Sequence, residues 1–419
     1  MSSLVEIVVP RRLGPGYRWL LASSWTSNLG DGIVLAAGPL LVASQTDQEF
    51  LVALAALVQW LPPLLLGLYA GALTDRVDRR RLVIAVDLVR CGVLVLLATA
   101  VLTGAVSIVV VLVALFLLGT AEMFADNASS TILPMLVDRD DLAVGNARLQ
   151  TGFITVNQLA GPPLGAALFA AGAAWPFAAQ AVLVALGALL LSRLVLPHRP
   201  APTDGPRADR RLRAEVGEGF RWVRHHAAVR TLVLTIFAFN VTFGAAWSVL
   251  VLYATERLGL GAVGFGLVTT VGAVGGLLGT LSYGWITRRV SLGDLMRIGL
   301  VVETLTHLGL ALTTDPRVAL PIFFVFGAHA FIWGTTSITV RQRAVPARLQ
   351  GRVGSVNLVG VYGGLVIGSA LGGALAQGFG VTAPFWFAFV GSAVLVVVLW
   401  RQLSHIAHAD ARTAPLDDV

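Results

Sequence analysis

Residues 71–90 read GALTDRVDRRRLVIAVDLVR, a dense group of charged side chains in a chain that is otherwise strongly apolar. An apolar run of about twenty residues precedes this stretch and another follows it, so each run has the length of a membrane span. Arginine is costly to place in hydrocarbon, and Arg76, Arg79 and Arg80 therefore belong at the water edge. The stretch predicts a cytoplasmic hairpin loop between two transmembrane helices.

The composition is that of a membrane protein and excludes several other classes. Of the 419 residues, 56% are hydrophobic and only 13% are charged, far outside the range of soluble domains. The basic residues are all arginine, so the lysine of a phosphate-binding loop is missing and no cofactor is predicted. Cys91 is the only cysteine and the histidines lack zinc-motif spacing, so neither a disulfide nor a metal site is expected. The net charge of +7 is spread over loops, which favours membrane orientation over nucleic-acid binding.

Twelve apolar segments follow one another along the chain, each long enough to cross about 30 Å of hydrocarbon as a helix. They are residues 18–44, 50–74, 81–103, 106–132, 146–172, 174–196, 229–254, 261–286, 292–313, 317–342, 352–377 and 381–402. They are too long for barrel strands and lack strand alternation. The first exceeds a signal-peptide core and contains Asp31, so it is expected to be a retained span. The predicted fold is an all-α polytopic membrane protein with twelve transmembrane helices.

The loops predict orientation and domain boundaries. Nearly all arginines lie in alternate loops and at the two termini, and the positive-inside rule places both termini in the cytoplasm. From Arg210 on, the one long polar stretch can form an amphipathic helix with Leu212, Val216, Phe220 and Val223 against the membrane face. The predicted parts are a tail at 1–17, a six-helix half at 18–196, a linker at 197–228, a second half at 229–403 and a tail at 404–419.

An internal repeat relates the two halves at an offset of about 210 residues. SNLGDG at 27–32 matches FNVTFG at 239–244, and GALTDRV at 71–77 matches GWITRRV at 284–290. A third match aligns Gly119 with Gly327. Two parallel six-helix repeats joined by a linker are typical of transporters whose substrate site lies at the repeat interface.

These motifs resemble those of a known family over essentially the whole chain. GALTDRVDRR at 71–80 resembles the loop signature of the major facilitator superfamily, although Asp78 replaces its glycine, and GPPLG at 161–165 resembles the motif of its antiporters. SNLGDG, AEMFADNASSTILP and GEGFRWVRH resemble the branch of macrolide-efflux proteins and the enterobactin exporter. The resemblance implies a monomer in the bacterial inner membrane that exports a drug or secondary metabolite in exchange for protons. The fourth span lacks the arginine that many drug/proton antiporters use.

Three carboxylates inside predicted spans are candidates for proton coupling, because a charge within the bilayer is costly unless it is neutralised or paired. Asp31 lies near the middle of the first span, where it carries protons or, alternatively, packs against Asn28 on the same helical face. Glu122 is either a second proton carrier or the partner of a cationic substrate. Asp126 lies four residues further on the same face and is expected to pair with Arg90, which has a similar depth.

The second half lacks these carboxylates, and of the residues at the aligned positions only Asn28 keeps its type, as Asn240. Both asparagines are expected to line the substrate cavity. We therefore expect the first half to sense protons and the second to form an aromatic wall for an apolar or cationic substrate. The alternative is that the aromatic side chains face lipid or pack inside the bundle. The predicted wall consists of Phe243, Trp247, His329, Phe331 and Trp333. Glu303 and His307, four residues apart, are interpreted as a local hydrogen-bonded pair.

Two further sets of residues are predicted to serve conformational change. The charged hairpin and one intramembrane arginine are expected to lock the outward-facing state by closing the cytoplasmic side; these residues are Gly71, Asp75, Arg76, Arg79, Arg80 and Arg90. Glycines at fourfold spacing allow close helix approach and are expected to form sliding surfaces between the halves, with tight packing inside one half as the alternative. This set contains Gly161, Pro162, Gly165, Gly272, Gly276, Gly360, Gly364, Gly368 and Gly372.

Together these features predict a secondary transporter, not an enzyme, whose partners are a small molecule, protons and the lipid bilayer. A proton-coupled metabolite importer is the first alternative. A membrane enzyme would need a convergent cluster of catalytic side chains at the interface, and none is evident in the sequence. A sensor would need a further soluble domain, for which the linker is too short.

Overall fold

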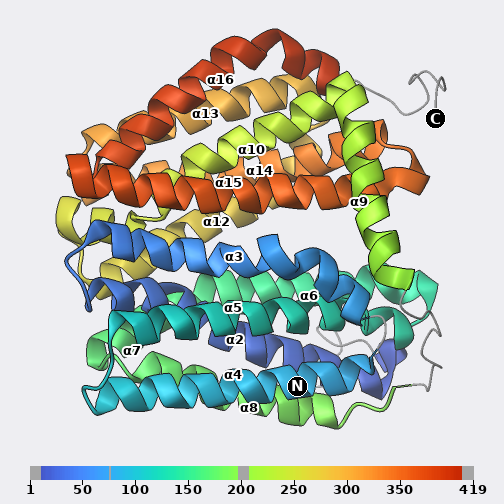
Figure 1. Ribbon diagram of the computed structural model, residues 1–419, viewed down its shortest axis with the longest axis vertical. Helices are drawn as coiled ribbons and strands as arrows, with labels where there is room; N and C mark the ends of the chain where they lie inside the picture. The colour runs from blue at the N-terminus through green and yellow to red at the C-terminus, as the bar shows by residue number, and fades with distance from the viewer. Residues whose placement is uncertain (1–10, 75–76, 197–206, 408–419) are drawn as a thin grey trace. The chain divides into compact units, whose positions relative to one another are not determined.

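A computed structural model describes residues 11–74, 77–196 and 207–407, and these ranges contain helices and no β-strand (Figure 1). Of the predicted tails, residues 1–10 and 408–419 lie outside these ranges, as do the loop residues Asp75 and Arg76. The first long helix begins earlier than predicted, at Gly14, and the last one continues to Ala407. Eleven described helices are long and apolar enough to cross a membrane. The principal helices are α2 (Gly14–Ala43), α3 (Glu49–Thr74), α4 (Arg79–Leu102), α5 (Ile108–Ser130), α8 (Trp175–Ser192), α10 (Ala227–Trp247), α12 (Ala262–Ile286), α13 (Leu292–Leu312), α14 (Pro316–Ala344), α15 (Gln350–Phe379) and α16 (Ala383–Ala407).

The fifth predicted span is a broken helix. It consists of α6 (Leu142–Gly152), a π-helical segment η4 (Phe153–Ala160) and α7 (Gly161–Ala171). Pro162 and Pro163 follow the π segment after Gly161 and have no N–H to donate to the preceding turn, so regular α-helical bonding is interrupted there. With the eleven long helices, this segment completes the twelve that the sequence predicts.

Polar side chains in the short loops fix where several helices begin. Asp78 accepts a hydrogen bond of 2.9 Å from the backbone N–H of Arg81 and caps α4. Ser291 caps α13 in the same way, and Asp315 caps α14. At the start of α10 the Nδ1 atom of His226 accepts from a backbone N–H, and burial lowers the pKa of this histidine, which favours the neutral, accepting form.

Contacts divide the chain into two compact units that are described separately. Unit 1 comprises residues 1–47, 58–203 and 260–270, and unit 2 comprises 48–57, 204–259 and 271–419. The boundaries therefore fall within α3 and α12, each of which contributes to both units. In each unit a few long helices carry most of the packing.

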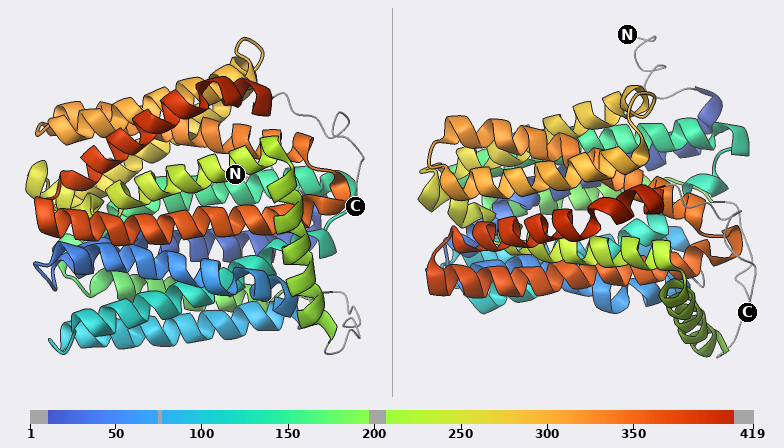
Figure 2. Two further views of the ribbon diagram at one scale, coloured as in Figure 1. Left: turned by 45° about the horizontal axis from the view of Figure 1, so that its top comes forward. Right: turned by 90° about the horizontal axis from the view of Figure 1, so that it is seen from above.

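The two units pack equivalent pairs of helices, as an internal repeat requires. In unit 1, α2 packs against α7 and α8, and α4 packs against α5 and α8. In unit 2, α10 packs against α15 and α16, and α13 packs against α14 and α16. Figure 2 shows α10 and α15 side by side in two further views.

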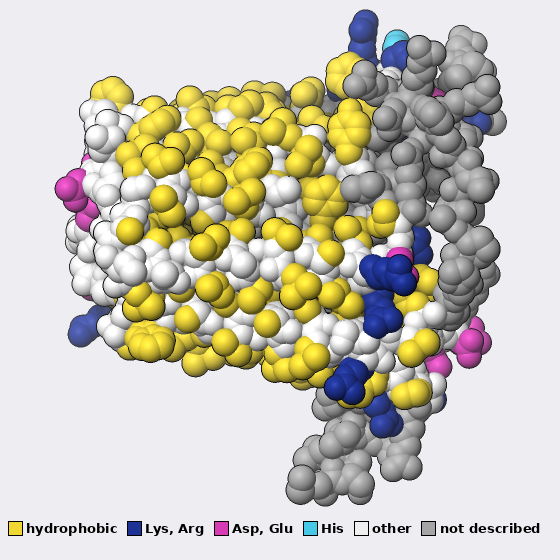
Figure 3. All heavy atoms as spheres, turned by 60° about the horizontal axis from the view of Figure 1, so that its bottom comes forward, with side chains coloured by type: hydrophobic (Ala, Val, Ile, Leu, Met, Phe, Trp, Pro, Cys, Tyr) yellow, Lys and Arg dark blue, Asp and Glu magenta, His cyan; other side chains and the backbone are white. Residues whose placement is uncertain are grey.

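The outer surface has the character of a membrane protein. Leu96 on α4 is 72% exposed and Val397 on α16 is 80% exposed, and many other large apolar side chains are exposed with them. So large an apolar surface indicates contact with lipid. Figure 3 shows a broad hydrophobic band on one face, with arginine side chains gathered at one end of it. We call this the arginine-rich end.

The predicted linker helix is present as α9 (Arg207–His225), which crosses the ends of α10 and α15 (Figure 1). Val223 is buried among side chains of α10, α15 and the end of α14, so it packs against protein and not against the membrane face as predicted. Phe220 is 60% exposed, and the side chain of Leu212 is outside the described set. Glu218 forms an ion pair with Arg352 of α15.

Candidate transport sites

The segment NLGDG at 28–32 places Asp31 between two points of close helix approach. A Cβ atom on Gly30 would lie 3.1 Å from Cγ of Gln180 in α8, and one on Gly32 would lie 2.8 Å from Cα of Asn157 in η4. Since both glycines lack a side chain, both neighbours come close to α2. Gln180 thereby donates a hydrogen bond of 2.9 Å to Oδ1 of Asp31.

A buried ion cluster surrounds Asp31. Arg90 of α4 is 3% exposed and hydrogen-bonds both Asp31 and Asp87, with a distance of 3.2 Å between its Nη1 and Oδ1 of Asp87. The predicted pairing of Arg90 with Asp126 is therefore wrong. The prediction relied on the similar depth of the two residues in the bilayer, but depth does not fix the direction in which a side chain points from its helix. Sequence reasoning also missed Asp87, although a carboxylate three residues before an intramembrane arginine was a usable signal.

The cluster opens onto a cavity of about 740 Å³ in unit 1. Polar side chains from α2, α4, α5, α6 and η4 line it. Asn28 and the three carboxylates predicted to couple protons are among them. The charged and amide side chains in its wall include Asn28, Asp31, Asp87, Arg90, Glu122, Asp126 and Asn157. Four carboxylates thus share one guanidinium, which leaves an excess of three negative charges when all are ionised.

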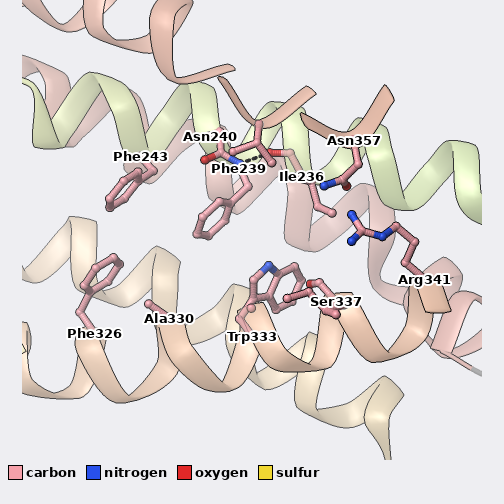
Figure 4. A pocket seen from close by; sticks show the side chains of 13 residues that line it. Ile236, Phe239, Asn240, Phe243, Phe326, Ala330, Trp333, Ser337, Arg341 and Asn357 are labelled. Carbon is pink, nitrogen blue, oxygen red and sulfur yellow. Dashed lines mark hydrogen bonds between the residues drawn. The ribbon is translucent and has the colours of Figure 1, made fainter. Parts of the chain in front are cut away.

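Unit 2 contains a smaller pocket of about 420 Å³ between α10, α14 and α15 (Figure 4). The predicted residues Asn240, Phe243 and Trp333 line it, together with Phe239 and Phe326, which the sequence reasoning missed. The ring centroids of Phe239 and Trp333 are 6.0 Å apart, and those of Phe243 and Phe326 are 5.8 Å apart, with nearly parallel planes. The aromatic wall is therefore a set of stacked faces that α10 and α14 contribute together.

One end of this pocket is polar. Figure 4 shows Arg341 and Asn357 pointing toward each other at that end, with Ser337 nearby. Oδ1 of Asn357 and Oγ of Ser337 are buried and have no hydrogen-bond partner among the described residues. A ligand with both donor and acceptor groups would satisfy them. The pocket therefore suits an amphipathic molecule.

The other predicted wall residues are not part of the pocket lining. The ring of Trp247 packs on Phe326 at a centroid distance of 4.3 Å. Phe331 packs against Gly276 of α12. His329 is 7% exposed and lies beside Glu303 of α13. The helical spacing of the aromatic residues did not distinguish those that line the pocket from those that pack elsewhere.

The glycine stripes pack within each unit, which corrects the prediction of sliding surfaces between the halves. A Cβ on Gly165 would lie 2.9 Å from Cα of Ile33 in α2, and one on Gly368 would lie 3.0 Å from the backbone N of Ala245 in α10. Small residues indicate close approach but do not identify the neighbour. Members with such neighbours inside their own unit are Gly161 and Gly165 against α2, Gly272 and Gly276 against α14, and Gly360, Gly364, Gly368 and Gly372 against α10. Pro162, buried in α7, is the exception, because a Cβ on Gly266 of α12 would lie 3.0 Å from its backbone oxygen. At this member of the predicted set, the fifth span contacts the eighth, a helix of the other predicted half.

The described arginines of the predicted latch contact unit 1 itself. Arg79 lies 3.3 Å from the sulfur of Met135, and Arg80 donates to the carbonyl of Ser192 at the end of α8. Arg90 belongs to the buried cluster around Asp31. Gly71 lies in the last turns of α3, and the remaining two latch residues fall outside the described ranges.

This fold, with two repeats of six membrane-spanning segments and polar or aromatic cavities within them, defines a polytopic membrane transporter. A family model described as transmembrane secretion effector matches residues 13–417. The chain belongs to this family, within the major facilitator superfamily, whose members are transporters and not enzymes.

Two relatives in this family are named as efflux proteins. The multidrug efflux pump Tap of Mycolicibacterium fortuitum is 27% identical over 387 residues, which cover 87% of this chain and 90% of Tap. Macrolide efflux protein A of Streptococcus pyogenes is 22% identical over 368 residues, covering 85% of this chain and 88% of that protein.

Solved structures share the fold at lower identity. A bacterial homologue of the iron transporter ferroportin has a TM-score of 0.72 at 17% identity, covering 94% of this chain and 98% of the homologue. The nucleoside transporter NupG has a TM-score of 0.70 at 13% identity, covering 94% of this chain and all of NupG. At these identities the likeness shows the fold alone.

Proposed function

We propose that the protein is a proton-coupled exporter of small amphipathic compounds in the bacterial inner membrane. In this proposal both termini are cytoplasmic, a single chain alternates access between the two sides, and protons move inward as substrate moves outward. The named efflux activity of two relatives that match most of the chain supports the direction of transport. The arginine-rich end supports the orientation.

The observation that carries proton coupling is the excess of carboxylates in the unit 1 cavity. Asp31, Asp87, Glu122 and Asp126 share one compensating charge, that of Arg90. An uncompensated charge in a membrane interior is costly, and like charges in one cavity repel. Proton uptake by the cluster relieves both costs, and proton loss restores them. The cluster is thus suited to load and release protons during a transport cycle.

The unit 2 pocket supports an amphipathic substrate. Apolar or cationic parts fit the stacked faces of Phe239, Phe243 and Trp333, because aromatic faces attract both. The charge of Arg341 directs the acceptor groups of a substrate to the polar end. A pocket with an aromatic wall and one polar end is expected to bind many amphipathic compounds rather than a single one.

Proton exchange is tested in inside-out membrane vesicles that contain the protein. Respiration acidifies the vesicle lumen, and a pH-sensitive dye reports the gradient. Addition of a macrolide or of ethidium should release protons from the lumen and partly restore dye fluorescence. Asp31→Asn should abolish the response. Asp47→Asn, which changes an exposed carboxylate in the loop after α2, should leave it intact.

The opposite results would contradict the proposal. If Asp31→Asn responds like the wild type, the carboxylate cavity does not couple protons to transport. If substrates instead increase lumen acidification, the protein works as a proton-coupled importer. Protein amounts in the vesicles are matched by immunoblot so that loss of expression is not mistaken for loss of coupling.

A further inference from the structure

A second buried ionisable cluster lies in unit 2 and has no part in the proposed cycle so far. It consists of Glu303 and His307 on α13 and His329 on α14. Glu303 and His307 are fully buried, and His329 is 7% exposed. Nε2 of His307 hydrogen-bonds Oε1 of Glu303 at 2.9 Å, and Nε2 of His329 lies 3.4 Å from Oε2 of Glu303. The three side chains form one connected group.

The hydrogen bonding of this cluster is incomplete. Oε2 of Glu303, Nδ1 of His307 and Nε2 of His329 are buried without a hydrogen-bond partner among the described residues. A neutral His329 that keeps its proton on Nδ1 presents a lone pair from Nε2 to the lone pairs of Oε2, and no hydrogen bond forms between them. A proton added at Nε2 converts this contact into a charge-assisted hydrogen bond, which is typically about 2.7–2.9 Å long.

Charge balance favours the same event. A buried carboxylate flanked by two neutral imidazoles carries one uncompensated negative charge, whereas one imidazolium makes the cluster neutral. Other charged side chains on the surrounding helices lie toward the helix ends. Among the described side chains, Asp294 and Arg297 of α13 pair with each other. The others are Arg317, Arg341 and Arg343 on α14, Arg401 on α16 and Arg230 on α10. The cluster must therefore balance its own charge.

The cluster touches the back of the aromatic wall. The ring of His329 lies 6.2 Å from that of Phe326 and 6.3 Å from that of Trp333, and both of these residues line the pocket. The ring of His307 lies 6.0 Å from that of Trp247, which in turn packs on Phe326. A change in the position or charge of either imidazole is therefore felt at the pocket surface within one layer of side chains.

We propose that Glu303, His307 and His329 form a proton-binding site that controls ligand affinity in the unit 2 pocket. Binding of one proton at Nε2 of His329 closes the gap to Glu303 and draws the α14 side of the aromatic wall toward α13. The imidazolium also places a positive charge behind the surface on which a cationic ligand stacks. Proton binding therefore lowers the affinity for such a ligand. This inference rests on the proposed use of the pocket for substrate.

The test measures ligand binding without transport. The purified protein is placed in lipid nanodiscs, and the dissociation constant of ethidium, whose charge is constant between pH 5.5 and 8.5, is measured by fluorescence anisotropy. The wild type should bind ethidium about tenfold more weakly at pH 5.5 than at pH 8.5, equivalent to about 1.4 kcal/mol. His329→Gln should remove most of this difference. His226→Gln, which changes a histidine outside the cluster, should retain it.

Proton binding is also read directly in the unmodified chain, so the test does not depend on a variant that folds poorly. In protein labelled with nitrogen-15 histidine, one ring signal should titrate between pH 5.5 and 8.5 and shift when ethidium is added. Its absence from spectra of His329→Gln, or of His329→Asn where that variant folds better, assigns it. A wild-type affinity that is constant with pH, or cluster histidines that do not titrate in this range, would overturn the inference.

The two proposals fail in different ways. A normal proton response in vesicles with pH-independent ethidium binding would reject the unit 2 proton site and leave the exporter intact. Ethidium binding that depends on pH through His329, without any proton response in vesicles, would support the site and reject proton-coupled export.

Discussion

Unit 1 and unit 2 are built on the same backbone plan but contain different chemistry. The amide of Asn28 donates to the carbonyl four residues earlier at 2.8 Å, and the amide of Asn240 does the same at 2.7 Å. Gly32 allows the fifth span to approach α2, and Gly244 allows α15 to approach α10. Residues that determine backbone approach have thus been kept in both repeats, since a side chain at those points would separate the helices.

The chemical difference lies in how each unit handles charge. In unit 1 the cluster of Asp31, Asp87 and Arg90 opens onto a cavity with further carboxylates. In unit 2 the cluster around Glu303 is sealed behind an aromatic wall. The first arrangement is suited to exchange protons with water in a cavity, and the second to sense a proton through a contact with the ligand surface. Four predictions separate the shared plan from the divergent chemistry.

Arg90→Met should have the largest effect. It removes the only guanidinium in the unit 1 cluster and leaves Asp31 and Asp87 without a counter-charge. Breaking a buried ion pair by removing one partner typically costs about 3–5 kcal/mol. We expect a much lower thermal midpoint in detergent and a low yield of folded protein.

The control for this prediction is Arg193→Met, since Arg193 is exposed at the end of α8. It should change the midpoint by no more than the error of the measurement. If Arg90→Met folds with wild-type stability, the buried ion cluster does not hold α2 and α4 together.

Gly165→Ala and Gly368→Ala test the shared plan in the two units. Each new Cβ would meet the backbone of a neighbouring helix, α2 in one case and α10 in the other. The helices must shift, at a cost of about 1–3 kcal/mol in each unit. Gly92→Ala, on a part of α4 with no atom within 4 Å of the new Cβ, should be neutral or slightly stabilising. Unequal losses of stability from the two substitutions would show that close helix packing is not equivalent in the two repeats.

Hydropathy and loop charge predicted the fold, because each span must satisfy its own backbone in lipid. The side-chain network was harder to predict. The pairing of Arg90 with Asp31 and Asp87 depends on the rotation of two helices about their axes, which spacing within one helix does not reveal. Glu303 and His307 were found from their spacing, whereas the contact with His329 joins two different helices.

Phe243→Ala tests the pocket in unit 2. The ring of Phe243 stacks on that of Phe326, and both line the pocket. Loss of one aromatic face should weaken ethidium binding by about 0.5–1.5 kcal/mol, roughly two- to tenfold. Phe389→Ala on α16 removes a ring that packs on Trp386 outside the pocket and should leave affinity unchanged. Equal effects of the two substitutions would place ethidium elsewhere.

Glu218→Gln should have the smallest effect. The ion pair between Glu218 of α9 and Arg352 of α15 is partly exposed, and such pairs contribute about 0.2–1 kcal/mol. The loss in stability should be measurable at low ionic strength and smaller in about 0.5 M salt, where the Debye length shortens to roughly 4 Å and screening weakens the pair. Arg221→Gln, whose side chain donates to the carbonyl of Gly217 in the same helix, serves as the matched control. If the loss of stability is as large in high salt as in low salt, packing and not charge holds α9 in place.

The central claim is that carboxylates of unit 1 exchange protons for substrate, and reconstitution tests it most directly. Purified protein in liposomes with a luminal pH indicator is given an ethidium gradient, with no initial pH gradient and with the membrane potential clamped by potassium and valinomycin. The wild type should move protons against the direction of ethidium flow, and Asp31→Asn should not. Ethidium flux through the wild-type protein without any change in luminal pH would contradict the claim.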